Sequence, residues 1–566
     1  MKKDNPSKSA VSSDDLLVPE RRKFLANLGK TTVAAAVVGA AMPFLEERSS
    51  VVAQSRGINN SFYQQRALAS YQFRVAAAQG NFQPIPPLFR RPNNGDEELY
   101  PNRIASYSKA LPHQSNGEVV PSAYFAFLDA IRTGDPAMFE QIPLGGTRKL
   151  TNPQAGLAYD GEGADAFTFI QPPAPAFASK ETAAEIAENY WMALLRDVAF
   201  TDYPLNTVAQ AAAADLTAFG ADFKGPKNGS GQVTPDLLFR GLTTGDRTGP
   251  LMSQFWYQAC NFGANEINQR IRTTVPNLNY MTDFATWLAI QNGAAPASGN
   301  VFDPTLRYMR NGRDLGQWVH IDVLFQGYFQ AFLVIAGMGV PFDAGNPYST
   351  STTQDGFATF GGPHVATLLC EVSTRALKAV WNQKWIVHRR LRPEVFAQRV
   401  DRTAFHGAGY PVHPEILTSL NTASRLGGYL PSGHALLPMA FPEGSPTHPA
   451  YGAGHATVAG ACVTILKAWF NESFVISSPL VPNTNGTSLV PYAGDPLTVG
   501  GELNKIASNV ANGRNIAGVH WRSDATESLK LGEALAISIL KDQKNCYNEI
   551  FNGFSLTKFD GTTITV

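Results

Sequence analysis

Apolar residues recur with the period of an α-helix from about residue 179 to residue 553, and this periodicity limits the possible folds more than any other feature of the chain. Glu181 to Phe200 carries apolar side chains at helical spacing, with acidic residues early and Arg196 late. Gln317 to Gly337 is apolar on nearly every face, as expected of one buried helix. The same reasoning predicts helices over His364–Lys384, Ala456–Phe470 and Glu527–Ile550. The sequence therefore predicts an all-α catalytic domain of helical bundles over residues 179–553.

The two flanks of this helical region have different patterns. Residues 54–178 are rich in Pro, Asn and Gln, and Pro84 to Pro101 and Pro172 to Pro175 are typical of extended segments that wrap over a neighbouring surface. Only the last residues, 554–566, have the pattern of strands. There Asp560-Gly561 separates two short β-prone runs, which predicts a small C-terminal β-hairpin.

The first 53 residues are typical of a targeting segment. Glu20-Arg21-Arg22-Lys23-Phe24-Leu25 precedes a small apolar run from Thr31 to Pro43, the pattern of a twin-arginine export signal. The run is short and rich in alanine, so no membrane span is expected in the mature chain. A chance Arg-Arg pair before a buried helix is the alternative. The pattern predicts an exported protein, periplasmic or extracellular.

Composition excludes several functional classes. Hydrophobic residues make up 44% of the 566 residues, and 46 Lys and Arg balance 46 Asp and Glu. Such a neutral chain has no bulk field for nucleic acid, so any anion site must be a local group of cations. The four cysteines form no Cys-x-x-Cys pair, which argues against a zinc or haem site and leaves disulfides and free thiols equally open: Cys260, Cys370, Cys462 and Cys546.

A first basic segment runs from Lys384 to Glu394. Lys384, His388 and Arg392 are spaced i, i+4 and i+8, which would place them on one face of a helix. Pro393 limits the continuation of that helix, so Arg392 would lie near its end with its guanidinium free to bind an anion. The alternative is a solvated basic face.

A second segment, Ser445 to Gly460, contains Gly452-Ala453-Gly454-His455 at the start of an apolar helix. The N–H groups of a helix start favour anions, and Gly454 allows close approach of a ligand. His455 would project beside that anion for acid–base work, although a simple capping turn is the alternative. A similar run, Pro431-Ser432-Gly433-His434, is followed by Leu-Leu-Pro and is interpreted as a loop.

A third segment, Asn512 to Asp524, adds Arg514 and a histidine–aspartate pair. His520 and Asp524 are spaced i, i+4, so the carboxylate can hold one imidazole nitrogen and orient the other. An ordinary structural pair is the alternative. Together the three segments supply cations, a helix start, an oriented histidine and a free histidine, which is what a phosphate-like anion requires. Each charge-assisted hydrogen bond would contribute about 1.5–3 kcal/mol when shielded from water.

The order Lys-x7-Arg-Pro, then Gly-His at a helix start, then Arg-x5-His-x3-Asp resembles the vanadium-dependent haloperoxidases and the related acid phosphatases of the phosphatidic-acid-phosphatase type. Ser-Pro-Thr-His448-Pro ahead of Gly-His is similar to the bromoperoxidase branch of algae and cyanobacteria. The resemblance covers most of residues 180–550 and implies the helical-bundle architecture of that superfamily.

The resemblance implies a role for each matching residue. His520 would bind vanadium, and His455 would accept a proton from peroxide. Lys384, Arg392 and Arg514 would neutralise the vanadate oxygens, and the Gly454 N–H would donate to one of these oxygens. Lys384 would also polarise the peroxide. His448 and Trp381 would line the halide side.

These roles imply a vanadate-dependent enzyme that oxidises bromide or iodide, and less readily chloride, with hydrogen peroxide. The product would be a hypohalous-acid equivalent that halogenates a small organic acceptor. A homo-oligomer and a structural calcium ion are further expectations, the latter without a readable site. Two alternatives remain open: an acid phosphatase with His520 as nucleophile, and a non-catalytic exported anion-binding protein.

One position departs from the family pattern. The family usually has Ser-Gly-His, whereas this chain has Ala453-Gly454-His455. The missing hydroxyl would cost about 0.5–1.5 kcal/mol of oxyanion binding if nothing replaces it. Ala453 therefore bears directly on vanadate affinity.

Overall fold

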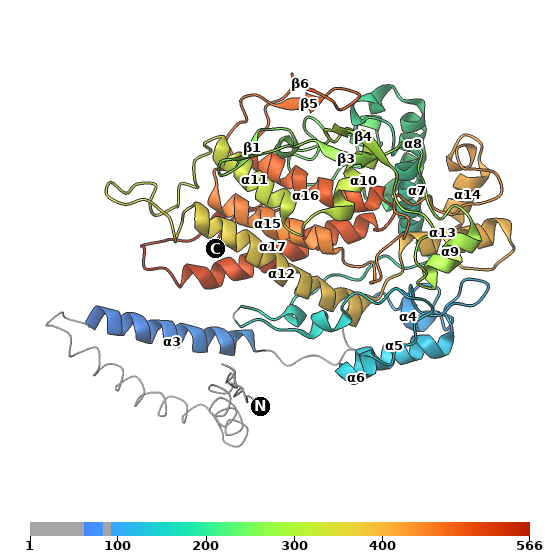
Figure 1. The fold of residues 1–566 in the computed structure, drawn as a ribbon, viewed down its shortest axis with the longest axis horizontal. Coiled ribbons are helices and arrows are strands. Elements are labelled where there is room, and N and C mark those ends of the chain that lie inside the picture. Colours follow the sequence, from blue (N-terminus) through green and yellow to red (C-terminus); the bar gives the residue numbers. More distant parts are fainter. Residues whose placement is uncertain (1–60, 83–91, 162) are drawn as a thin grey trace, which may run out of the picture. The chain divides into compact units, whose positions relative to one another are not determined.

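The computed structural model describes residues 61–82, 92–161 and 163–566. The predicted export signal, residues 1–53, lies outside these ranges. Helices dominate the described chain, as predicted (Figure 1). The α-helices are α3 Ser61–Asn81, α4 Asp96–Leu99, α5 Pro121–Thr133, α6 Pro136–Phe139, α7 Lys180–Leu194, α8 Thr207–Ala218, α9 Phe284–Gln291, α10 Gly312–Ile321, α11 Gln326–Gly337, α12 Gly362–Trp381, α13 Pro393–Phe405, α14 Pro414–Asn421, α15 Gly454–Trp469, α16 Val499–Ile516 and α17 Arg522–Lys544.

The centre of the core is formed by α12, α15, α16 and α17. Helix α15 packs against the other three, and α16 is buried along its whole length (Figure 1). A helix that is covered on all sides needs small or apolar residues on every face, which explains the Ala- and Gly-rich sequence of α15. Since α15 begins at Gly454 and α17 follows His520, this packing sets the positions of two candidate site segments.

Two glycines allow α15 and α17 to approach closely. A Cβ atom on Gly460 of α15 would lie 2.1 Å from the carbonyl oxygen of Leu529 in α17. A Cβ on Gly532 of α17 would lie 2.0 Å from the carbonyl oxygen of Thr457 in α15. Both clashes are with backbone atoms, which cannot rotate away, so each helix presents a glycine to the backbone of the other.

We expect Gly460→Ala to lower the free energy of unfolding by about 1–3 kcal/mol, because an overpacked core must shift backbone to admit the methyl group. The matched control is Gly337→Ala at the end of α11, where a Cβ would meet nothing within 4 Å. That change should be neutral or stabilising by up to about 1 kcal/mol. Urea unfolding of both variants is the measurement, and equal stabilities would contradict this account of the α15–α17 contact.

The single helix expected over Gln317–Gly337 was wrong. Helix α10 ends at Ile321, Asp322 is extended, and α11 begins at Gln326 after a bend of 105°. Uniform apolarity along the segment concealed this break, because both halves are buried. Among the described residues no single helix is long and apolar enough to cross a membrane, and α10 with α11 passes that test only as a bent pair.

Strand structure is more widespread than expected. The C-terminal hairpin is confirmed, with Leu556 of β7 opposite Ile564 of β8. The expectation that no other part of the chain forms strands was wrong, because short antiparallel pairs also occur in the loops. Such pieces are too brief to give a clear alternating pattern. The strands are β1 Cys260–Phe262, β2 Asn265–Ile267, β3 Ile271–Thr274, β4 Phe302–Arg307, β5 Leu480–Pro482, β6 Leu489–Pro491, β7 Ser555–Thr557 and β8 Thr563–Thr565, paired in that order.

The region expected to be an extended arm, 54–178, is only partly irregular. It contains the regular helices α3 and α5, and the short helix α4 lies within Pro84–Pro101, where an extended segment was expected. Residues 83–91 of that segment lie outside the described ranges, and Pro172 to Pro175 has no regular element, as predicted. A second apolar cluster joins α5 to the segment that carries Lys384, through Phe127 and Trp385 with ring centroids 5.9 Å apart. Helix α5 therefore packs against the segment that carries Lys384.

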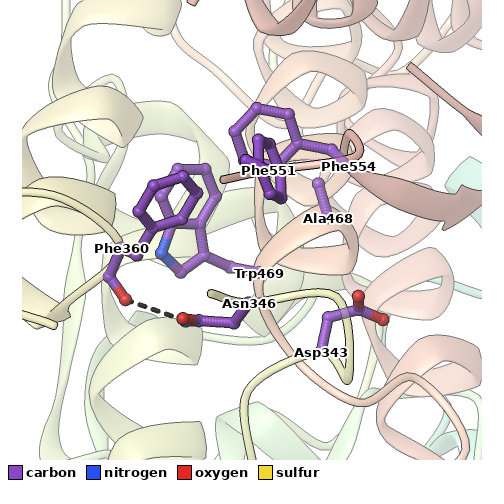
Figure 2. A pocket seen from close by; sticks show the side chains of 7 residues that line it. All are labelled: Asp343, Asn346, Phe360, Ala468, Trp469, Phe551 and Phe554. Atoms are coloured by element: carbon purple, nitrogen blue, oxygen red, sulfur yellow. Dashed lines mark hydrogen bonds between the residues drawn. The ribbon is translucent and has the colours of Figure 1, made fainter. Parts of the chain in front are cut away.

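An aromatic cluster holds the C-terminal segment on the bundle. Phe551 and Phe554 lie 4.7 Å apart between ring centroids, and Phe554 packs 5.0 Å from Trp469 of α15. Figure 2 shows these rings around a small pocket with Phe360, whose carbonyl accepts a hydrogen bond from Asn346 Nδ2 at 3.0 Å.

Candidate active site

Lys384 and Arg392 converge, but not on one helix face as predicted. Lys384 lies in a short π-helical segment, Asn382–His388, that continues α12. Arg389 then adopts a left-handed conformation with φ of 40°, and Arg392 is the residue that precedes α13. The chain reverses between the two cations, so a turn brings them together rather than helical spacing.

His388 is not part of the site, which corrects its expected place beside the two cations. Its ring is buried against Tyr451, with centroids 4.8 Å apart and nearly perpendicular planes. Burial and the neighbouring arginines lower the pKa of His388 to about 3. It is a neutral core histidine.

His448 lies between the two cations. Its Nδ1 atom is 2.9 Å from Lys384 Nζ and 2.9 Å from Arg392 Nη2. The ring of Trp381, at the end of α12, packs 4.9 Å from His448 between centroids, and Lys384 Nζ lies 4.7 Å from the Trp381 ring. The predicted halide-side pair is thus next to the predicted anion-binding lysine.

His520 is held in a defined orientation by Asp524. Its Nδ1 atom is 2.8 Å from Asp524 Oδ2, and that oxygen also accepts from the Trp521 N–H. A proton on Nδ1 leaves the lone pair on Nε2, which faces Arg392 Nη1 at 3.0 Å. His520 Nε2 therefore carries the lone pair that could bind a metal centre, and in this structure it accepts a hydrogen bond from Arg392.

A chain of buried charged side chains fixes the position of Asp524. Arg390 Nη1 lies 3.1 Å from Asp524 Oδ1, and Arg390 Nη2 lies 2.8 Å from Glu185 Oε2. Arg390 and Glu185 are positioning residues that were not predicted from the sequence. No local pattern indicates them, because Glu185 lies on α7, far from Asp524 in the sequence.

Arg514 reaches the site from α16. Its Nη1 donates to the carbonyl of Val319 at 2.6 Å, and its guanidinium carbon lies 5.4 Å from the Phe441 ring. The Nε atom is buried and has no hydrogen-bond partner among the described residues. An unpaired buried donor on a cation is suited to bind an anion.

His455, the second residue of α15, makes an ion-pair contact that sequence analysis did not foresee. Its Nε2 atom is 3.0 Å from Asp322 Oδ1, at the break between α10 and α11. The His455 side chain is 31% exposed, whereas Asp322 is 6% exposed. A partly open histidine fixed by a buried carboxylate is suited to proton transfer. The one sequence feature that could have indicated this contact is the presence of a charged residue, Asp322, within an otherwise apolar segment.

The start of α15 provides a close backbone approach. The first N–H groups of a helix have no partner within the helix, and Gly454 is the first residue of α15. A Cβ on Gly454 would lie 3.2 Å from Trp381 Cζ3, so the glycine leaves room that a side chain would fill. Ala453, which precedes the helix, offers no side-chain cap. Its N–H donates to Ser528 Oγ at 2.8 Å.

The electrostatics of the site favour an anion. Burial, followed by repulsion from Arg392 and Arg514, holds the pKa of Lys384 well below its usual range. Burial also lowers the pKa of Arg392 and of Arg514 to about 10. The pKa values of His448 and His520 are lowered well below normal by burial and then by neighbouring cations. Buried like charges of this kind are stabilised by a negative ligand.

The residues present fit a vanadate ion. A tetrahedral oxyanion accepts hydrogen bonds from cations and helix-start N–H groups, and its metal centre can bind an imidazole nitrogen. The unpaired Arg514 Nε, the space at Gly454 and the oriented His520 Nε2 satisfy these needs. With His388 excluded, the cluster is formed by the residues to which the family resemblance assigned roles: Trp381, Lys384, Arg392, His448, Gly454, His455, Arg514 and His520.

Other predictions have different outcomes. All four cysteines are free thiols. His434 follows a turn at Ser432-Gly433 and lies in a loop, not at a helix start, as predicted. Within the described ranges, no group of three or more His, Cys, Asp or Glu side chains could hold a metal ion, so the structural calcium stays a prediction.

We expect oxyanion binding to be accompanied by proton uptake. The pKa of Lys384 is depressed in the anion-free site and rises when a negative charge binds beside it, so protonation increases at any pH between the two values. Tungstate is a suitable probe, because it is tetrahedral and does not titrate near neutral pH. Calorimetry in buffers of different ionisation enthalpy measures the uptake, and Lys384→Met should reduce it. Proton release by the wild-type protein would contradict the charge assignment.

Comparisons with known proteins agree with this geometry. The family model described as "VCPO second helical-bundle domain" matches residues 371–549. A vanadium-dependent bromoperoxidase of Corallina pilulifera is 37% identical over 601 residues, covering 90% of this chain and 100% of that protein. A second from Corallina officinalis is also 37% identical over 90% of this chain and 100% of its own length.

A solved structure extends the match to three dimensions. The homohexameric second vanadate-dependent bromoperoxidase of Ascophyllum nodosum superposes with a TM-score of 0.81 at 33% identity, covering 88% of this chain and 90% of that chain. With the site residues in place and the relatives matched over nearly their full length, this chain belongs to the vanadium-dependent bromoperoxidase family.

Proposed function

We propose that this protein is a vanadate-dependent enzyme that oxidises bromide, and also iodide, with hydrogen peroxide to a hypohalous-acid equivalent. The observation that carries the proposal is the single cluster of His520 Nε2, three buried cations and the His455–Asp322 pair. Family membership supports the choice of vanadate over phosphate as the working anion.

Each residue has a distinct task in this proposal. His520 Nε2 would bind the metal centre, with its proton held on Nδ1 by Asp524. Lys384, Arg392 and Arg514 would hold the oxyanion charge in a site from which water is largely excluded. When bound, vanadate supplies a Lewis acid that activates peroxide for halide oxidation without a change in the metal's oxidation state.

His455 would accept the proton that hydrogen peroxide loses on entering the site. Asp322 fixes its ring and stabilises the imidazolium that forms. Trp381 and His448 would shape the halide position next to Lys384. Lys384 would then polarise the peroxide while bromide attacks.

The test is an assay after reconstitution with vanadate. We expect bromination of a phenol dye that requires vanadate, bromide and peroxide together. An acid phosphatase would instead hydrolyse a chromogenic phosphate ester and be inhibited by vanadate. Phosphatase activity without bromination would refute the proposal, and an intact fold that retains no vanadium would favour a non-catalytic anion-binding protein.

We expect Ala453→Ser to tighten vanadate binding. Position 453 directly precedes α15 and is buried, so a hydroxyl there can cap the helix or donate to the oxyanion. The gain should be about 0.5–1.5 kcal/mol, or up to roughly tenfold in the dissociation constant. Titration of vanadium-free enzyme followed by activity measures it. Weaker binding would mean that the pocket has repacked around Ala453.

Two further properties are proposed on narrower grounds. The twin-arginine pattern at Arg21-Arg22 supports export, which Arg21→Lys with Arg22→Lys should block in a cell-fractionation assay.

The homohexameric relative from Ascophyllum nodosum supports a homo-oligomer, which light scattering tests directly. A monomeric protein would refute the second.

A further inference from the structure

A cavity of about 300 Å³ reaches the carboxylate that holds His455. Asp322 contributes to its wall, together with Trp318 and Gln317 of α10, Gln330 of α11 and the residues around strand β3. The lining residues come from α10, from α11 and from the segment that leads into β3, and α10 packs against β3 (Figure 1). The cavity is therefore adjacent to the proton-transfer pair of the proposed enzyme.

The inner wall of the cavity is apolar and aromatic. Trp256 and Trp318 are buried and meet edge to face, with ring centroids 4.6 Å apart. Met309 and Ile271 extend this surface. Next to Asp322, the side chain of Ile321 is 69% exposed, which is unusual for a large apolar residue beside a buried carboxylate. Such a wall suits a planar apolar molecule.

Two arginines line the cavity near strand β3. The Arg272 guanidinium lies over the Phe302 ring at 4.0 Å, and Arg270 Nε contacts Asn268 Oδ1 at 3.3 Å. Both side chains are exposed, and in the described part of the chain neither has an ion-pair partner. The cavity thus carries positive charge that an anionic ligand would neutralise. The cavity therefore combines an aromatic wall with a cationic side.

We propose that this cavity binds the organic acceptor, and that the acceptor is an electron-rich aromatic carboxylate of the phenol or indole class. The proposal rests on the bromide-oxidising function proposed above, which supplies the hypobromous acid. A ring carbon of the bound acceptor attacks the bromine, and the O–Br bond breaks. The hydroxide that leaves combines with the ring proton to form water, so the net reaction replaces C–H by C–Br.

Competition between two matched acceptors tests the proposal in the vanadate-reconstituted full-length enzyme. Indole-3-acetate and its neutral analogue indole-3-acetamide are supplied at equal concentration, and the ratio of brominated products is compared with that from reagent hypobromite. We expect the enzyme to favour the carboxylate about fivefold over the reagent ratio. Arg270→Gln with Arg272→Gln should return the ratio to the reagent value without changing bromide oxidation.

Two variants serve as controls. Arg132→Gln changes an exposed arginine on α5 that does not line the cavity, and it should leave the product ratio unchanged. Ile321→Asp places a negative charge at the cavity and should lower the carboxylate preference.

The outcomes are distinguishable. If neither acceptor is brominated, the proposed function fails. If the wild-type ratio equals the reagent ratio, hypobromite reacts only after release and this inference fails. If the double arginine variant changes the oligomeric state, these arginines are subunit contacts and the acceptor site is refuted.

Discussion

His520→Ala is expected to abolish vanadium retention and, with it, halide oxidation. His520 is fully buried, and Asp524 holds its Nδ1 atom so that Nε2 is directed toward the buried cations. Without this ligand the oxyanion would be held by ionic contacts alone, as a phosphate would be. Elemental analysis after gel filtration measures the metal content, and circular dichroism checks the fold.

Two other variants sharpen this result. Asp524→Asn keeps the imidazole but removes the acceptor that sets its tautomer, so vanadate affinity should fall about 10- to 100-fold. His388→Ala removes a buried histidine that lies on the Lys384 segment but outside the site, and it should retain vanadium. Unchanged metal content in His520→Ala would refute the ligand assignment.

Asp322→Asn is expected to lower kcat about 100-fold or more while vanadium content stays unchanged. The Asp322 carboxylate is 3.0 Å from His455 Nε2, and an amide can neither stabilise the imidazolium nor enforce the same tautomer. His455→Ala should cause a similar loss, because one variant removes the proton acceptor and the other removes the carboxylate on which that acceptor depends. Steady-state kinetics of reconstituted enzyme provide the measurement.

A second histidine–aspartate pair is the matched control. His406 Nε2 lies 3.4 Å from Asp401 Oδ2 outside the cluster, and His406 is 43% exposed. His406→Ala should therefore leave kcat unchanged. A double variant, Asp322→Asn with His455→Ala, should be no worse than either single change. If the two losses multiply instead, Asp322 acts on catalysis by a route that does not include His455.

The sequence by itself determined the chemistry of the anion site. Three segments of the sequence contain its cations and histidines. Helical periodicity after Gly454-His455 predicted that His455 lies at a helix N-terminus, and the structure confirms this position. The C-terminal hairpin followed from turn chemistry at Asp560-Gly561. These features are local: a helix period, a cap or a turn depends on residues within a few positions of one another.

Only the tertiary structure decided which side chains support the site. Local spacing predicted that His388 lies beside Lys384 and Arg392. The helix instead ends at Arg389, which is left-handed, and the His388 side chain packs in the core against Tyr451. Several features of the site join segments that are far apart in the sequence. They are the Asp322–His455 contact, the Glu185–Arg390–Asp524 chain and the cavity proposed for the acceptor. The physical reason is that a buried charge must find a partner in space, and no local pattern specifies which distant segment will supply it.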